Sequence, residues 1–245
     1  MRHSINFNQR NFNKTFVQGI MASVEKLKRK SSNCAGETKI KKAKVDKEKL
    51  PKRNKRGELK FADHPDFRPN RTPKEILQAG AFGGGYFRPI KSGVTNEKYK
   101  DCWKEFPEHW FEGVKPSLSI ANSTYDKSRN FYKVKCGASL EEWESSGWIK
   151  AQDPYGWFQW YCRFYLGRRT DDDERQIGRW HRFLSRFKTN LVNKIKKADA
   201  SYDNYTISPV IRQSLLHWGY QIVSQDLGGK RKPSEEESEK NVPLK

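Results

Sequence analysis

Charge is distributed very unevenly along this chain of 245 residues, and the distribution limits how much of it can fold. Residues 26–60 contain fifteen lysines and arginines against four acids, a net charge of +11, and no aromatic residue occurs between Phe16 and Phe61. Such a segment cannot bury enough apolar surface to offset the entropy lost on folding. We therefore predict a disordered basic arm over residues 1–60.

Two basic clusters separated by ten residues lie within this arm: Lys28, Arg29 and Lys30, then Lys41, Lys42 and Lys44. Their spacing resembles a bipartite nuclear localisation signal, which predicts a nuclear import receptor as a partner and the nucleus as the location. The alternative is a basic tail that binds any polyanion. Residues 1–24 contain no acid and resemble a mitochondrial presequence, so the mitochondrion is the alternative location, and Met21 is an alternative start to Met1.

Aromatic residues mark the part of the chain that can fold. The sequence has eight Trp, ten Tyr and fourteen Phe, and almost all of them lie after residue 60. This segment carries 26 cations against 20 acids over residues 61–228, so it is only mildly basic. We predict one compact domain over residues 61–227, followed by a disordered tail over residues 228–245.

Helix start and stop signals punctuate the domain. Thr72 with Pro73 and Glu75 forms a capping box, and Gly80 ends the short helix that follows. The same logic predicts four more helices: one from Ser139 to Gly147, one from Asp153 and Pro154 to Gly167, one after Thr170, and one from Ser208 and Pro209 to Gly219. Strand patterns are short, at 130–134 and 220–223 at most. The predicted fold class is therefore mainly α, a single multi-helix domain.

The helix from Pro154 carries large apolar residues in nearly every direction around its axis, which predicts a buried helix. Gln159 and Arg163 lie four residues apart and share a face. That face has to meet water, a partner or an internal acid.

A row of arginines on the next helix is the strongest candidate for function. At about 100° per residue, Arg175, Arg179, Arg182 and Arg186 fall within roughly 60° of one another. Guanidinium groups repeated about once per turn suit the phosphates of a polyanion, and Arg168 and Arg169 could extend the row. Ion pairing within the fold is the alternative, because Asp171 and Asp172 lie one turn before Arg175. Arg182 and Arg186 have no acid at those spacings.

The segment Gly83-Gly84-Gly85-Tyr86-Phe87-Arg88 is a second candidate, since Tyr86 could stack on a base and Arg88 could bind a phosphate. A tight turn that places its aromatics in the core explains the same residues. Among the tryptophans, Trp103 and Trp110 lie in a charged stretch and show the weakest helix-core spacing.

The sequence offers little for catalysis. Asp171, Asp172 and Asp173 with His181 could form a nuclease-like metal site, but successive helical residues point in different directions, and acids are favourable in a first helical turn in any case. No cofactor motif is present, the four cysteines show no CxxC pair, and no apolar run approaches the ~20 residues that a membrane span requires. We expect no metal, no cofactor and no membrane partner.

Three segments carry a resemblance: DPYGWFQWYCRFYLGRRTDDDERQIGRW from Asp153 to Trp180, GGYFRPI at 84–90 and SPVIRQSLLHWGY at 208–220. In these segments the chain resembles a protein family of protists, algae, fungi and large DNA viruses, without an activity to carry over. The resemblance covers about residues 64–222 and implies a single conserved domain.

Together these observations predict a non-enzymatic nuclear protein that binds DNA or RNA, with phosphates on the arginine-faced helix. One alternative is a protein-interaction module whose aromatic groove lies near Trp103, Trp110 and the glycine turn. Another is a metal-dependent enzyme that processes nucleic acid through the acidic turn.

Overall fold

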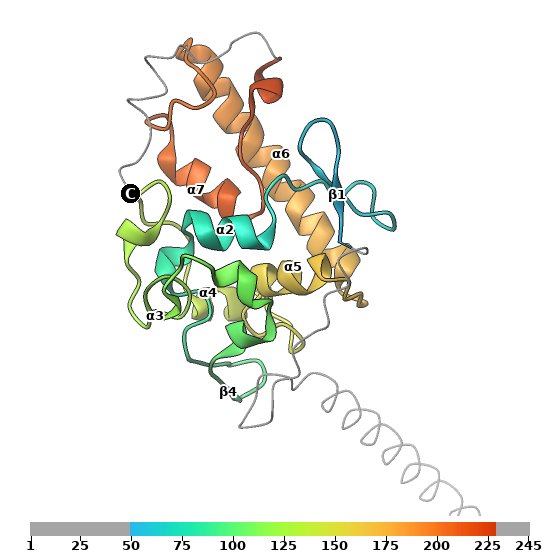
Figure 1. The fold of residues 1–245 in the computed structure, drawn as a ribbon, viewed down its shortest axis with the longest axis vertical. Coiled ribbons are helices and arrows are strands. Elements are labelled where there is room, and N and C mark those ends of the chain that lie inside the picture. Colours follow the sequence, from blue (N-terminus) through green and yellow to red (C-terminus); the bar gives the residue numbers. More distant parts are fainter. Residues whose placement is uncertain (1–49, 229–245) are drawn as a thin grey trace, which may run out of the picture.

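The computed structural model describes residues 50–228, of which 44% are helical and 6% are in strands, so the predicted mainly α fold is confirmed (Figure 1). The helices of this part are α2 (Pro73–Ala79), α3 (Pro116–Ser119), α4 (Leu140–Ser145), α5 (Trp157–Tyr165), α6 (Asp173–Lys197) and α7 (Pro209–His217). Short 3₁₀ helices lie at Phe82–Gly84, Cys102–Glu105, Glu108–Phe111, Lys127–Arg129 and Ser224–Leu227. Within residues 50–228 no helix has the length and apolar character needed to cross a bilayer.

The folded part begins earlier than the sequence predicted. Strands β1 (Lys52–Arg53) and β2 (Leu59–Lys60) form an antiparallel hairpin inside the segment assigned to the disordered arm. Leu59 is buried, and the Arg53 guanidinium bonds the Glu75 carboxylate of α2 at 2.6 and 2.7 Å. The buried Leu59 side chain and the ion pair between Arg53 and Glu75 of α2 therefore anchor the hairpin to the rest of the domain. The localisation-signal clusters at 28–30 and 41–44 lie outside the described residues.

The capping signals predicted from sequence are present. Thr72 accepts a hydrogen bond from the Glu75 amide while the Glu75 carboxylate accepts from the Thr72 amide, and Ser139 and Glu142 do the same at α4. These devices involve only neighbouring residues, so the local sequence is enough to specify them.

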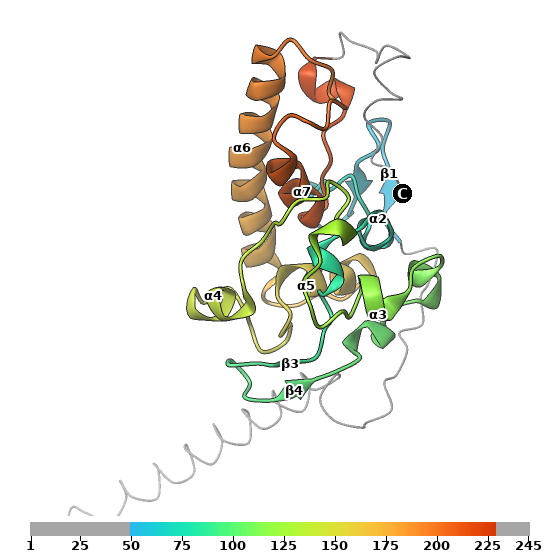
Figure 2. The same cartoon turned by 90° about the vertical axis from the view of Figure 1, so that its left-hand side faces the viewer.

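Helix α5 is the centre of the domain, as its all-round apolar character predicted. Seven of its nine residues are buried, and the other helices surround it (Figures 1 and 2). The helix begins at Trp157 rather than at Pro154, so Asp153 is not its cap. The buried Asp153 carboxylate instead bonds the guanidiniums of Arg163 and Arg168, at 3.0 and 2.5 Å. Of the surroundings predicted for Arg163, the internal acid is therefore the one found.

Helix α6 runs along one side of the molecule and α7 packs against it (Figure 2). The Trp180 indole of α6 donates to the Trp218 carbonyl at the end of α7, at 2.8 Å. The strands suggested at 130–134 and 220–223 are absent, because both segments are irregular. The second hairpin of the described chain is β3 (Ile90–Lys91) with β4 (Lys98–Tyr99), which pairs Ile90 with Tyr99.

Candidate nucleic-acid interface

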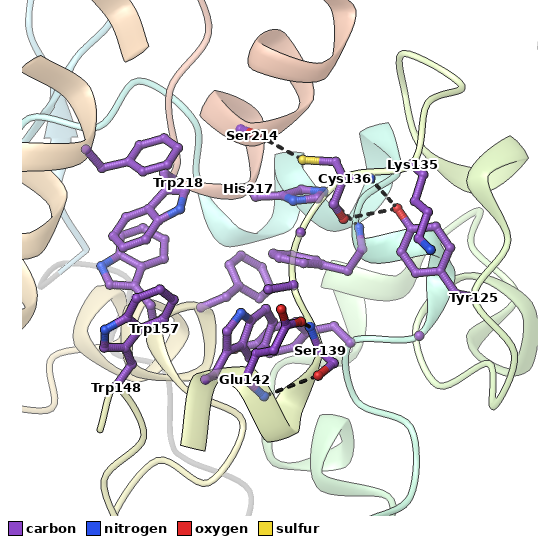
Figure 3. Close-up of a pocket in the computed structure, with 18 of the residues that line it drawn as sticks. Tyr125, Lys135, Cys136, Ser139, Glu142, Trp148, Trp157, Ser214, His217 and Trp218 are labelled. Atoms are coloured by element: carbon purple, nitrogen blue, oxygen red, sulfur yellow. Dashed lines mark hydrogen bonds between the residues drawn. The ribbon is translucent and has the colours of Figure 1, made fainter. Parts of the chain in front are cut away.

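A cavity of about 950 Å³ lies beside α6. Its walls come from the middle of α6, the end of α7, the start of α5, the glycine turn at 82–88, and the segment 135–149 that contains α4. In Figure 3, Trp218, Trp157 and Trp148 lie on one side of the cavity and Cys136, Lys135 and Tyr125 lie on the other. Asn122, Ser123 and Tyr125 line it as well, so six separate parts of the sequence meet at one site.

Stacked rings form one wall of this cavity. Trp157 and Trp218 have ring centroids 4.6 Å apart, Trp218 and Phe183 lie at 4.6 Å with an interplanar angle of 12°, and Phe183 and Phe187 lie at 4.4 Å. Trp157 and Trp218 come from α5 and the end of α7, while the two phenylalanines come from α6. We call these four rings the ring column. It offers an apolar and polarisable surface next to the arginines of α6.

Arg182 and Arg186 are exposed on the same stretch of α6 and both line the cavity. Neither forms an ion pair or a hydrogen bond with any side chain in the part of the chain that the structure describes. Exposed guanidiniums without carboxylate partners keep their full charge for a ligand. As their helical spacing indicated, these two residues have no acid partner among the described residues.

Arg179 lies between two indoles, with its guanidinium carbon 5.4 Å from the ring centre of Trp148 and 5.6 Å from that of Trp218. It donates to Gln176 Oε1 at 3.0 Å and to the Trp148 carbonyl at 3.3 Å, and it has no carboxylate partner among the described residues. Burial, together with the neighbouring Arg175, lowers the pKa of Arg179 to about 10. An anion bound beside it would offset this cost.

The other predicted arginines are neutralised within the fold. Arg175 bonds both oxygens of Asp172, at 2.5 and 2.8 Å, which is the internal pairing that its spacing allowed. Arg168 pairs with the buried Asp153, and Arg169 pairs with Asp63 at 2.5 Å. The row therefore reaches the cavity only from Arg179 onward, and the extension through Arg168 and Arg169 consists of cations already paired with carboxylates.

The glycine turn places its aromatics in the core, as the structural alternative predicted. Tyr86 is buried and its hydroxyl donates to the Tyr155 carbonyl at 2.5 Å, so its ring is not available as an exposed stacking platform. Arg88 is partly exposed and lines the cavity, where it donates to the Gly85 carbonyl at 3.2 Å. Of this pair, only Arg88 remains a candidate for contact with a phosphate.

The acidic turn before α6 serves the fold. Asp172 is buried against Arg175, and buried Asp173 accepts from the Trp160 indole at 2.8 Å and from the Thr170 amide at 2.9 Å. Within residues 50–228 no three His, Cys, Asp or Glu side chains are grouped so that they could hold a metal ion. The contacts of Asp172 and Asp173 thus follow the capping and packing alternative.

Three polar residues of the cavity have no signature in the sequence. The Cys136 thiol lies 2.9 Å from the Ser214 hydroxyl, and burial raises the pKa of Cys136. His217 accepts a hydrogen bond at Nε2 from the Phe82 amide, and burial lowers the pKa of His217 to about 3. A protonated thiol beside a neutral imidazole is the opposite of an activated nucleophile.

The tryptophans that face the cavity are not the ones selected from the sequence. Trp110 is buried and stacks on Phe106 at 5.5 Å, and Trp103 packs edge-on against Phe111 at 5.1 Å. The cavity is lined instead by Trp143, Trp148, Trp157 and Trp218. Helical spacing alone could not distinguish a ring that packs inside from one that lines a cavity, because the opposite wall comes from distant segments.

Comparisons with protein-family models, with curated proteins and with solved structures give no match, so the interface rests on its own geometry and the family resemblance stays a prediction.

Proposed function

We propose that this protein is a non-enzymatic nuclear protein that binds nucleic acid, with backbone phosphates on Arg182 and Arg186 of α6. The observation that carries the proposal is that these two guanidiniums are exposed and lack carboxylate partners within residues 50–228. The nuclear location rests on the basic clusters at 28–30 and 41–44 in the sequence.

Charge along α6 supports a polymeric anion. The stretch from Arg175 to Lys197 contains eight lysines and arginines and no acid. Two of the eight are neutralised, Arg175 by Asp172 and Lys188 by Asp226. The other six are Arg179, Arg182, Arg186, Lys194, Lys196 and Lys197.

The length of this surface also favours a chain of phosphates over a small anion. Arg182 and Lys197 are fifteen residues apart on one helix, which corresponds to about 22 Å at 1.5 Å per residue. A single phosphate would contact one or two of these cations, whereas a strand can follow the helix past several. Each contact releases counterions, so binding should weaken steeply with salt.

The test replaces Arg182 and Arg186 together with glutamine in the full-length protein. Binding of a labelled oligonucleotide is followed by fluorescence anisotropy between 50 and 200 mM salt. We expect affinity to fall roughly tenfold at the lower salt concentration, and the slope of log K against log salt to become less steep by about 1.4 to 1.8, for two lost phosphate contacts.

The matched control is Lys98→Gln with Lys100→Gln, which removes the same charge from two exposed residues in and beside β4 that do not line the cavity (Figure 1). This control should retain nearly all of the affinity. Equal losses in both double variants would show a nonspecific charge effect and would contradict the proposed interface.

A further inference from the structure

We infer that the cavity beside α6 holds an unpaired base of the strand whose phosphates contact Arg182 and Arg186, so that the protein selects single-stranded over double-stranded nucleic acid. The inference rests on the proposed function and specifies its ligand. Three features of the cavity carry it: two tryptophans whose rings contact no other aromatic ring, an arginine without a bonded carboxylate, and a lining that is aromatic and cationic together.

Two tryptophans of the cavity have rings that no other ring covers. Trp143 and Trp148 make no ring–ring contact within residues 50–228, while the other six tryptophans each pack against at least one aromatic ring. Trp148 is 45% exposed, although burial is the usual fate of so large an apolar ring. An exposed indole beside free arginines is the arrangement by which proteins stack bases of single strands.

Arg179 supplies the second feature. Its guanidinium is partly buried beside the rings of Trp148 and Trp218, and no carboxylate of the described chain bonds it; Asp172 attracts its charge from nearby but is already paired with Arg175. Burying a cation is costly unless a partner compensates. The phosphate attached to a base stacked on Trp148 would be such a partner. Trp148 would then contact the base, and Arg179 the phosphate, of the same nucleotide.

The lining as a whole fits the same ligand and disfavours others. Five cations line the cavity, Arg88, Lys135, Arg179, Arg182 and Arg186, against one acid. That acid, Glu142, accepts from the Ser139 amide at 2.7 Å as part of the α4 capping box. A cationic ligand would be repelled, and an aliphatic one would leave the charges without a partner. A planar ring that carries an anionic group can stack on the aromatic side chains and pair with the cationic ones.

The size of the cavity favours a single strand over a duplex. Its volume of about 950 Å³ is at the upper end of the ~300–1,000 Å³ typical of ligand pockets, which leaves room for a base with its sugar. In a duplex the bases are stacked and paired inside the helix, and extruding one costs unstacking energy. A single strand presents its bases without this cost.

The experiment compares three ligands on the full-length protein: a 12-nucleotide single strand, the duplex of the same sequence, and a mononucleotide. Each is titrated against the wild type and against Trp148→Ala. Trp148→Phe keeps an aromatic ring and serves as rescue, and Trp103→Phe serves as a control outside the cavity. Circular dichroism confirms that each variant is folded.

We expect the single strand to bind about tenfold more tightly than the duplex. Trp148→Ala should remove most of that difference, and Trp148→Phe should restore part of it. If the protein binds neither oligonucleotide, the proposed function itself is overturned. Equal affinity for strand and duplex, or a preference that Trp148→Ala leaves unchanged, would overturn the inference alone. Mononucleotide binding as tight as that of the strand would also overturn it, because the cavity would then be a nucleotide site.

Discussion

His217 is held in one protonation state by its surroundings. Its ring stacks on Phe82 with centroids 4.0 Å apart, and its Nε2 accepts from the Phe82 amide at 2.9 Å. The proton of the neutral ring therefore lies on Nδ1. Protonating Nε2 would place a charge in the buried interior, and this burial lowers the pKa of His217 from 6.5 to about 3.

This arrangement predicts a pH dependence of stability. The folded pKa of His217 is lower than the unfolded pKa, so the unfolded state binds one more proton between these values, and stability is lost as pH falls from about 6.5 toward 3. The loss should be about 1.4 kcal/mol per pH unit from this residue. We expect His217→Gln to flatten the dependence of unfolding free energy on pH by one proton. Urea unfolding at pH 4, 5, 6 and 7 measures it, and parallel curves for the two proteins would contradict the assignment.

Among elements, the glycine turn depends sharply on the absence of side chains. Gly84 has a φ of +76°, and a Cβ there would lie 2.3 Å from the Leu118 carbonyl oxygen, which is backbone and cannot move aside. Gly113 has a nearly equal φ of +72°, but nothing lies within 4 Å of its Cβ position. The two glycines therefore have nearly the same φ and differ in the space around the Cβ position.

We expect Gly113→Ala to lower the unfolding free energy by about 1–2 kcal/mol, the cost of a left-handed backbone. Gly84→Ala should cost about 1–3 kcal/mol more, because overpacking is added to the same backbone strain. Chemical denaturation of both variants measures the difference. Equal losses would contradict this expectation, because they would mean that the backbone of α3 moves away from the added Cβ at little cost.

The same scale shows what local sequence can specify. The capping boxes at Thr72 and Ser139 were predicted correctly because each is complete within four residues. The start of α5 was predicted wrongly because Asp153, which resembles a cap, is drawn instead to Arg163 and Arg168. The hairpin at 52–60 was missed because its anchors, Leu59 and Arg53, contact partners far along the chain that a count of charges does not reveal.

At the scale of the whole molecule, buried charge joins separate segments. The Arg163 guanidinium bonds Glu105 at 2.8 Å and Asp153 at 3.0 Å, and Asp153 also binds Arg168. The network ties a 3₁₀ helix, the turn before α5 and the residues after α5 to one another. The sequence indicated an internal acid as one possible partner for Arg163. It did not identify Glu105, because Glu105 is 58 residues away along the chain.

Removing the shared acid should destabilise the whole domain. Asp153→Asn keeps the side-chain volume but leaves two guanidiniums without their common carboxylate, and we expect a loss of about 3–5 kcal/mol. Asp63→Asn, which breaks the more exposed pair with Arg169, should cost less than about 1 kcal/mol. Thermal unfolding of the two variants decides the point, and similar melting temperatures would show that the buried network is not a major source of stability.

The site was predictable in part for the same reasons. Helical periodicity correctly placed Arg179, Arg182 and Arg186 together, since they belong to one element. It could not show that the ring column from α5, α6 and α7 borders them, or that Trp148 comes from another segment to face Arg179. One wall of the cavity is a local property of the chain, whereas the cavity itself is a property of the folded molecule.

The long stretch of α6 without acids also has a consequence for the speed of encounter. A helix whose free cations all lie in its last nineteen residues, from Arg179 to Lys197, gives the molecule a directional electric field. Such a field orients an approaching polyanion before contact and raises the association rate at low ionic strength. Diffusing strands should therefore be aligned with this helix before contact. Added salt should lower the association rate constant by a larger factor than it raises the dissociation rate constant.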